Sequence, residues 1–178
     1  MQSNRTIKLR RLEKEEQQLI NDPIANALVK REGVLNFHFV IYNLEGEYKG
    51  GFYHGLLELH ENYPFAAPKL YFYTPSGRFE LNMPICTSFT NYHQESWTSA
   101  WNVRSLLLGT ISFMTSNEAS YGCKNDTQEE RQRLAAASLQ FNLRNPKFRE
   151  LFLDQLRTVS PPIPTKILDQ YSSPEIES

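Results

Sequence analysis

The sequence predicts an α+β domain in which a four-stranded antiparallel sheet follows an N-terminal helix and precedes a central helix and two C-terminal helices. Three observations predict this class. Strand-like runs follow one another at hairpin spacing, which favours a meander over parallel crossovers. Helical periodicity occurs only before and after these runs. The 178 residues suffice for one domain with a substantial core.

Local signals along the chain predict each element. Apolar residues predict a first helix over residues 6–21, which Asn21-Asp22-Pro23 ends. Alternating and aromatic runs between turn residues predict strands at 26–31, 35–42, 51–60 and 69–73. The later helices are expected from about 103 to 114 (with Ser99 or Asn102 as cap), 127–144 and 146–156. A folded domain is therefore predicted over residues 1–158, with a flexible, proline- and serine-rich tail over 159–178.

Composition excludes several functional classes. A net charge of −1 argues against non-specific electrostatic binding to nucleic acid or membrane. Two distant cysteines and four scattered histidines predict neither a disulfide framework nor a zinc site, and they favour a reducing, intracellular setting. The first ten residues do not resemble a signal peptide, and the longest apolar segment, residues 106–114, is too short to span a bilayer. No cofactor or metal is expected.

The stretch from Tyr73 to Trp97 has no sustained periodicity, although aromatic and apolar residues occur throughout it. A long connection of this kind inside a compact domain is usually functional. Cys86 lies at its centre among hydrogen-bonding side chains, so we identify its thiol as the candidate reactive group.

Three interpretations of Cys86 follow from the residues alone. The thiol can be a small buried hydrophobe, as most free cysteines are. It can be the nucleophile of a cysteine hydrolase with His93 as base, but no local protease signature surrounds it, and an ordinary surface or packing role for His93 is favoured. It can also carry an acyl group by exchange, without an adjacent base, given oxyanion-stabilising groups and docking surfaces for proteins.

Two segments are candidate docking surfaces. Lys8, Arg11 and neighbouring basic residues make the first half of the N-terminal helix cationic, which indicates either a solvated face or a site for an acidic partner. Two prolines stiffen the loop around Phe65, so this ring either forms a fixed apolar knob at the surface or closes the end of the core.

The order and spacing of these features resemble the ubiquitin-conjugating enzyme family over roughly residues 6–156. The shared pattern comprises Tyr63-Pro-Phe-x-x-Pro68, a proline-containing tripeptide, the lone Cys86 and then Trp97. The chain is most similar to the tail-anchored, endoplasmic-reticulum-associated J-type branch. The residues that carry this similarity are 51–55, 74–79, Asn82, Tyr92-His93, 97–101 and 108–114.

The resemblance implies a function and roles for particular residues. Cys86 is expected to accept ubiquitin from the activating enzyme as a thioester and to pass it to an amine or hydroxyl of a protein substrate, usually with a ubiquitin ligase. The family places an asparagine where this chain has Ser76, so Ser76 and Asn82 are the candidates for oxyanion or loop support. Lys8, Arg11, Phe65, Ser99 and Ala100 are the expected partner-binding residues, although Ala66 and Ser99 depart from the family's common lysine and proline. Cys123, in the loop after the central helix, is expected to be a spare thiol.

The resemblance leaves one alternative function. Catalytically silent ubiquitin-binding variants share the fold but typically lack the cysteine.

The resemblance also bears on localisation. J-type members usually end in a membrane-spanning tail, which this chain lacks. It is therefore expected to be cytoplasmic, or to belong at the cytosolic face of the endoplasmic reticulum in a longer form, in protein degradation.

Overall fold

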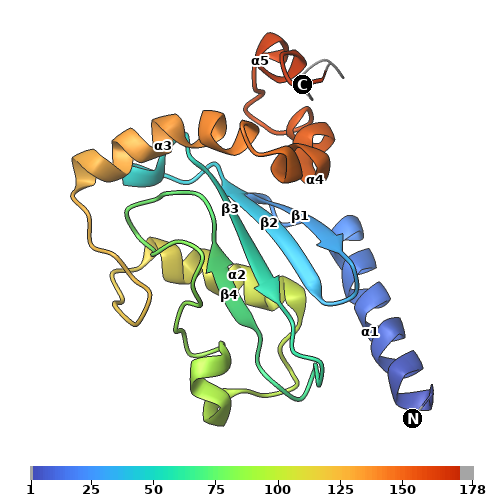
Figure 1. Ribbon diagram of the computed structural model, residues 1–178. Coiled ribbons are helices and arrows are strands. Elements are labelled where there is room, and N and C mark those ends of the chain that lie inside the picture. The colour runs from blue at the N-terminus through green and yellow to red at the C-terminus, as the bar shows by residue number, and fades with distance from the viewer. Residues whose placement is uncertain (1, 173–178) are drawn as a thin grey trace.

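The computed structural model describes residues 2–172 and confirms the predicted class. The sheet has the order β1-β2-β3-β4 with every neighbouring pair antiparallel, and helices flank it on both faces (Figure 1). The first half comprises α1 (Gln2–Asn21), β1 (Ala27–Glu32), β2 (Asn36–Tyr42), the short 3₁₀ helix η1 (Gly46–Tyr48), β3 (Phe52–Glu58) and β4 (Lys69–Phe72). The second half comprises the 3₁₀ segment η2 (Asn91–Ser96), α2 (Val103–Thr115), α3 (Gln128–Leu143), α4 (Pro146–Leu156) and α5 (Thr165–Asp169).

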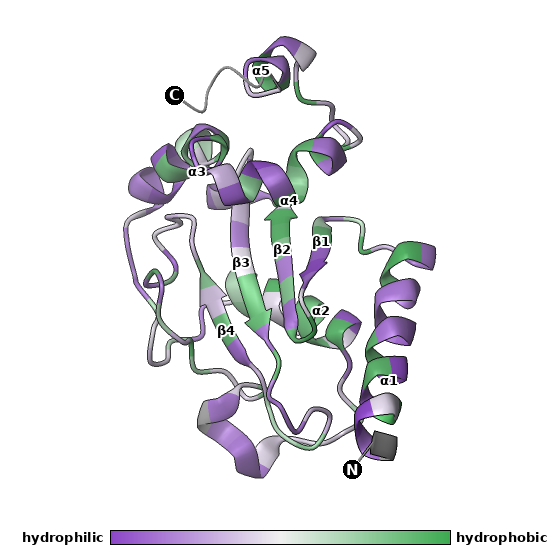
Figure 2. Cartoon of the chain, turned by 45° about the vertical axis from the view of Figure 1, so that its right-hand side comes forward, coloured by the Kyte–Doolittle hydropathy of each residue, from purple (hydrophilic) through white to green (hydrophobic). Residues whose placement is uncertain are grey.

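The inner face of the sheet, which α2 covers, holds the main core. Strand alternation sends Phe37, Phe39 and Ile41 to this face, where they are fully buried with Leu106 and Leu107 of α2. In Figure 2 hydrophobic residues concentrate around β2, β3 and α2, while α1 alternates between hydrophobic and hydrophilic residues. Of the two predicted caps of α2, Ser99 and Asn102, the structure uses Asn102, whose side chain accepts a hydrogen bond from the Ser105 amide.

Gly55 of β3 permits this close packing. A Cβ atom there would lie 2.4 Å from the Phe39 ring and 2.6 Å from the Tyr71 carbonyl oxygen. Only glycine therefore lets the aromatic ring rest against the strand.

The outer face of the sheet carries a second core beneath α4. Val40 and Tyr42 pack there with Phe148 and Phe152, so both faces of the central strands are buried. Helix α3 is tied to β3 by its Asn142, whose Nδ2 donates to the Phe52 carbonyl over 2.7 Å.

The chain after residue 158 differs from the predicted flexible tail. Residues 165–169 form α5, and Leu168 is fully buried in the second core. Arg157 pairs with Asp169 over 2.9 Å. Apolar residues at 163, 167 and 168 therefore dock this segment although its prolines suggested a linker; residues 173–178 of the expected tail lie outside the described range. Among residues 2–172 no helix is both long and apolar enough to cross a membrane.

Candidate active site

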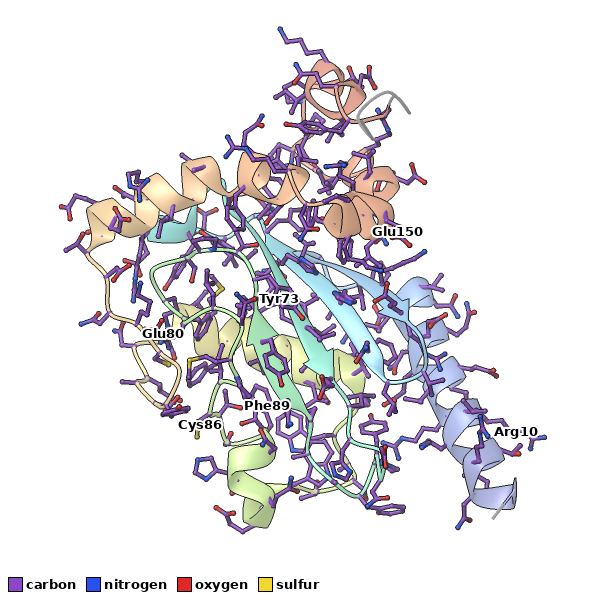
Figure 3. The ribbon with its side chains drawn as sticks, viewed as in Figure 1. Arg10, Tyr73, Glu80, Cys86, Phe89 and Glu150 are labelled. Carbon is purple, nitrogen blue, oxygen red and sulfur yellow. The ribbon has the colours of Figure 1, made fainter. Side chains whose placement is uncertain are left out.

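Cys86 lies in the irregular segment between β4 and α2, at a side of the molecule remote from Arg10 of α1 (Figure 3). Backbone hydrogen bonds hold the preceding residues along β4, with the Asn82 amide donating to Phe72 over 3.0 Å and the Ile85 amide to Leu70 over 2.9 Å. Further along, Phe89 is buried and packs on Trp101 with ring centroids 5.4 Å apart. The segment is thus fixed on both sides of the half-buried thiol.

The loop between α2 and α3 fixes the peptide of Cys86. The Cys86 amide donates to the Tyr121 carbonyl over 2.9 Å, and the Ser120 hydroxyl donates to the Cys86 carbonyl. Gly122 allows this approach, because it has a φ of +91° and a Cβ there would lie 3.1 Å from the Pro84 carbonyl oxygen. The loop therefore forms one wall of the site.

His93 lies directly beside the thiol. Its Nε2 is 3.0 Å from Cys86 Sγ, and its Nδ1 is 3.1 Å from Oε1 of Glu95. A carboxylate can only accept hydrogen bonds, so Nδ1 carries the proton and Nε2 of the neutral ring accepts the thiol hydrogen. The favoured sequence interpretation, an ordinary surface or packing histidine, did not anticipate this contact. It depends on a kink inside η2, where His93 has φ −129° and ψ 58°, and no sequence signal marks such a kink.

The electrostatic surroundings keep the thiol protonated. Burial raises the pKa of Cys86, and the nearby Cys123 and Glu95 add to the rise. The pKa of Glu95 is lowered, chiefly by its own backbone amide and then by His93, so this carboxylate is ionised at neutral pH. Cys86 therefore needs a base to become a thiolate, and His93 is positioned to serve as one.

The two candidate support residues differ in position. Ser76 is fully buried, and its Oγ accepts hydrogen bonds from the amides of Arg78 (3.1 Å) and Phe79 (3.3 Å). Of its two predicted roles, this geometry fits loop support. Asn82 is exposed, has a φ of +58°, and makes no side-chain hydrogen bond within the described residues. Its amide is therefore free to donate.

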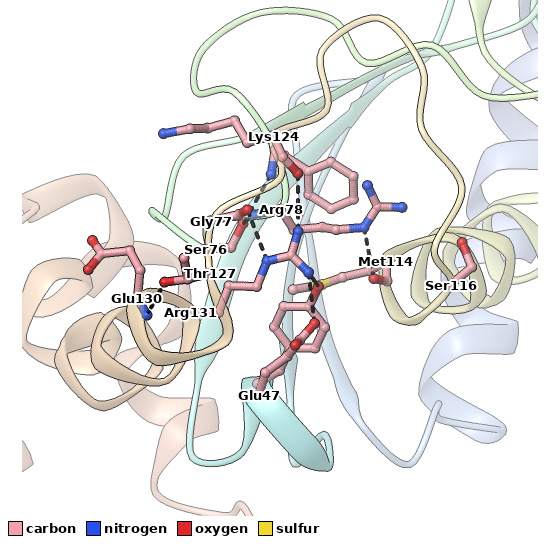
Figure 4. A network of polar contacts seen from close by, with 12 residues as sticks. Glu47, Ser76, Gly77, Arg78, Met114, Ser116, Lys124, Thr127, Glu130 and Arg131 are labelled. Carbon is pink, nitrogen blue, oxygen red and sulfur yellow. Dashed lines mark hydrogen bonds and ion pairs between the residues drawn. The ribbon is translucent and has the colours of Figure 1, made fainter.

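Two arginines that sequence reasoning did not single out join the turn at residues 76–78 to the loop after α2 (Figure 4). Arg78 Nε donates to the Met114 carbonyl over 3.1 Å, and its Nη2 donates to those of Phe113 (2.9 Å) and Glu118 (2.6 Å). Arg131 donates to the carbonyls of Gly77 (3.0 Å) and Lys124 (3.1 Å). These contacts fix the loop between α2 and α3, which is the wall of the site that contacts Cys86.

The predicted partner-binding residues lie on one side of the molecule. Lys8 Nζ donates to the Glu61 carbonyl over 2.9 Å, and Arg11 Nη2 donates to the Ser99 carbonyl over 3.1 Å. Phe65 is 79% exposed and Ala100 is exposed, so the ring is a surface knob. The structure thus joins α1, the Phe65 loop and the Ser99 loop into one surface.

A buried carboxylate beneath this surface was missed from sequence. Glu15 accepts hydrogen bonds from the Tyr63 hydroxyl (2.7 Å and 2.9 Å) and from the Val103 amide (3.3 Å). Burial raises its pKa, against the effect of these hydrogen bonds and of Arg11. In the sequence Glu15 stands in a run of charged residues, where nothing separates it from its exposed neighbours.

No group of three His, Cys, Asp or Glu side chains in the part of the chain that the structure describes is arranged to hold a metal ion. Cys123 is half-buried and lies 3.5 Å from the Ser120 hydroxyl.

Comparison with known proteins identifies the family. The model of the family described as "Ubiquitin-conjugating enzyme" matches residues 9–138. The chain is 41% identical over 145 residues to "Ubiquitin-conjugating enzyme E2 J2-like" of Dictyostelium discoideum, covering 80% of this chain and 85% of that protein. It is 38% identical over 147 residues to "Ubiquitin-conjugating enzyme E2 34" of Arabidopsis thaliana, covering 81% and 62%.

The human relative is "Ubiquitin-conjugating enzyme E2 J2", which is 38% identical over 120 residues, 67% of this chain and 46% of that protein. The chain thus spans most of the Dictyostelium protein but less than two thirds of the Arabidopsis and human ones. It belongs to the ubiquitin-conjugating enzyme family, in the J2 branch.

Proposed function

We propose that this enzyme accepts the C-terminus of ubiquitin from the activating enzyme as a thioester on Cys86 and transfers it to an amine or hydroxyl of a protein substrate. The observation that carries the proposal is the contact of 3.0 Å between Cys86 Sγ and His93 Nε2 in a segment fixed from both sides. Membership of the family supports the pathway, and the contact supports activation of the thiol by His93.

Loading requires a thiolate. His93 takes the thiol proton, and Sγ attacks the carbonyl carbon of the thioester on the activating enzyme. The tetrahedral intermediate then expels the thiolate of the activating enzyme, which takes up the proton from His93 Nε2 as it leaves. Ubiquitin remains on Cys86, and Nε2 no longer carries the proton. ATP is consumed by the activating enzyme in forming its own thioester, so no cofactor is required on this chain.

Transfer reuses the same histidine. Once Cys86 is a thioester, Sγ has no hydrogen to donate, and Nε2 of His93 becomes free to accept a proton beside the reacting carbonyl. The acceptor attacks this carbon, its proton moves to Nε2, and Sγ leaves as the thiolate. A base matters most for a hydroxyl acceptor, which is a weak nucleophile while protonated.

The oxyanion that forms during attack needs a hydrogen-bond donor. We assign this role to the Asn82 side chain, which is exposed and free of other hydrogen bonds within residues 2–172, and not to Ser76, which supports the turn. Asn82→Ala is expected to slow discharge to a free nucleophile; discharge at the parent rate would exclude Asn82 as the donor.

The surface formed by Lys8, Arg11, Phe65, Ser99 and Ala100 is assigned to the activating enzyme and the ubiquitin ligase. Its support is that hydrogen bonds from α1 hold the Ser99 loop and the loop preceding Phe65, which leaves the Phe65 ring exposed. Phe65→Ala is expected to weaken ligase-stimulated discharge, and an undiminished response to ligase would refute the role. By its resemblance to the J-type branch, we place the enzyme in the cytoplasm or at the cytosolic face of the endoplasmic reticulum, in protein degradation.

The deciding experiment is incubation with activating enzyme, ATP and ubiquitin, followed by a non-reducing gel. We expect a thiol-sensitive adduct that Cys86→Ala abolishes. A folded protein that binds ubiquitin but forms no adduct with a competent activating enzyme would instead be a silent ubiquitin-binding variant.

The Cys86–His93–Glu95 arrangement also fits a cysteine hydrolase, because the thiol contacts a base and the base contacts an orienting carboxylate. The two activities differ in what accumulates. A transferase holds the adduct until an acceptor is added, whereas a hydrolase releases free ubiquitin from substrates without ATP or activating enzyme.

A further inference from the structure

Arg78 is a buried cation without a carboxylate partner. Arg78 is only 3% exposed, and no Asp or Glu among residues 2–172 lies within ion-pair distance of its guanidinium. Three carbonyls at and after the end of α2 and the rings of Phe79 and Phe113, each 5.0 Å from its carbon Cζ, provide its surroundings. Carbonyl dipoles and aromatic faces compensate a cation only in part, so the position still favours an anion.

One nitrogen of this guanidinium is unused. Nε and Nη2 both donate to carbonyls, whereas Nη1 has no partner in the described part of the chain. Arg78 lines a cavity of about 380 Å³ together with Ser116, Glu118, Ser120, Cys123 and Lys124. This volume falls in the range of about 300–1,000 Å³ that is typical of ligand pockets.

The charges around this cavity are unequal. Arg78, Lys124 and Arg131 contribute three cations and Glu118 one carboxylate, and Arg131 is already satisfied by Glu47 over 2.7 Å. Lys124 is exposed, and its one ion pair within residues 2–172 is with Asp126, at 3.6 Å. Glu118 makes no ion pair within the described residues, so its carboxylate competes for the cavity from within the lining, while Asp126 competes for Lys124.

The cavity shares a wall with the reactive cysteine. Ser120 lines it and also donates to the Cys86 carbonyl, while Cys123 lies 3.5 Å from the same hydroxyl. A group bound at Arg78 would therefore lie against the loop after α2, whose Ser120 contacts the Cys86 peptide.

From this geometry we propose that Arg78 Nη1 and Lys124 form an acceptor subsite, which binds an anionic side chain, carboxylate or phosphate, next to the residue that receives ubiquitin. This inference rests on the proposed transferase function and adds a substrate class to it. A charged donor that is buried gives stronger and more selective recognition of an anion than an exposed lysine alone.

The test compares single-turnover discharge of the purified thioester to three capped peptides. Each carries one acceptor lysine, and the neighbouring residue is glutamate, phosphoserine or glutamine. The anionic peptides are expected to reach half-maximal rate at about tenfold lower concentration than the glutamine peptide, which corresponds to one charge-assisted hydrogen bond. The better of the two anionic peptides distinguishes a carboxylate from a phosphate.

Two cavity variants with opposite expected effects on the peptide preference separate anion binding from a general structural effect. Lys124→Gln should reduce the preference for the anionic peptides, whereas Glu118→Gln should increase it by removing the competing carboxylate. Lys166→Gln, on the distant α5, is the matched control and should leave the preference unchanged. Equal half-saturation of all three peptides in the parent would overturn the proposal, as would shifts of the same sign in both cavity variants.

A binding measurement on unloaded protein keeps this test independent of the transferase proposal. Titration with the phosphoserine peptide should shift the NMR resonances of Arg78 Nε–H and of the amides in residues 116–126. Shifts confined to other parts of the protein would overturn the subsite. Failure of the activating enzyme to load Cys86 would instead count against the transferase function.

Discussion

Two histidine contacts in this molecule have similar lengths and different surroundings. In the irregular segment, His93 Nε2 is 3.0 Å from Cys86 Sγ, and the His93 side chain is 43% exposed. On the outer face of the sheet, His54 Nε2 is 2.9 Å from His38 Nδ1, and His54 is only 3% exposed. The rings of Phe148 and Phe152 lie 5.5 Å and 5.6 Å from that of His54.

Burial decides what each contact can do. Desolvation, with a smaller contribution from His38, lowers the pKa of His54 to about 3, so this ring stays neutral and acts in packing. His93 stands at the surface, and its other ring nitrogen, Nδ1, lies 3.1 Å from the ionised carboxylate of Glu95. Of the two histidines, only His93 contacts a group that can react, the Cys86 thiol.

The largest expected effect comes from replacing His93. We expect His93→Ala to slow discharge of the thioester to a free hydroxyl nucleophile by about 10²-fold, the lower end of the usual contribution of a general base. His93→Gln, which keeps a polar group but cannot take up a proton, should be equally slow. Discharge rates of the isolated thioester against pH measure the effect, and recovery of the parent rate in His93→Gln would show that His93 only positions the thiol.

The sequence and the structure agree where packing follows periodicity. Strand alternation placed Phe37, Phe39 and Ile41 in the core, where the structure buries them fully. The spacing of motifs singled out Cys86 as the candidate reactive thiol. The contact of His93 with Cys86 was considered but not favoured, because it depends on how a loop without periodicity folds back over seven residues. Arg78 was quoted only as part of a branch motif, since a buried arginine that binds carbonyls has no partner of opposite charge to reveal it in sequence.

The helix α5 escaped prediction for a related reason. Its five residues are too few for a periodic signal, and three prolines at 161, 162 and 164 suggest a linker. Leu168 becomes buried only because α3 and α4 already provide an apolar surface. Tertiary packing thus decides the structure of this segment.

An effect of intermediate size is expected from His54, on the pH dependence of the free energy of unfolding. Because the folded-state pKa of His54 is lowered to about 3, the unfolded chain binds more protons below the ordinary value of 6.5. The contribution of His54 to the free energy of unfolding is therefore fully present above pH 6.5 and is lost as the pH is lowered. The loss from this residue alone is about 2 kcal/mol between pH 7 and pH 5. Desolvation also lowers the pKa of His38, which adds to the loss.

Urea unfolding of His54→Gln between pH 7 and pH 5 measures this contribution. Glutamine keeps a hydrogen-bonding group for His38 but does not titrate, so the slope of unfolding free energy against pH should become shallower. A variant with the parent slope would show that His54 is accessible to protons in the folded state.

The smallest expected effect comes from Glu95, which completes the comparison. Its side chain is 73% exposed, and water and salt screen its interaction with His93 even at 3.1 Å. Glu95→Gln should therefore slow discharge only about threefold, and raising the salt concentration should narrow the difference from the parent. A loss as large as that of His93→Ala would mean that orientation of the ring by this carboxylate, and not the proximity of Nε2 to Cys86 alone, makes the histidine a base.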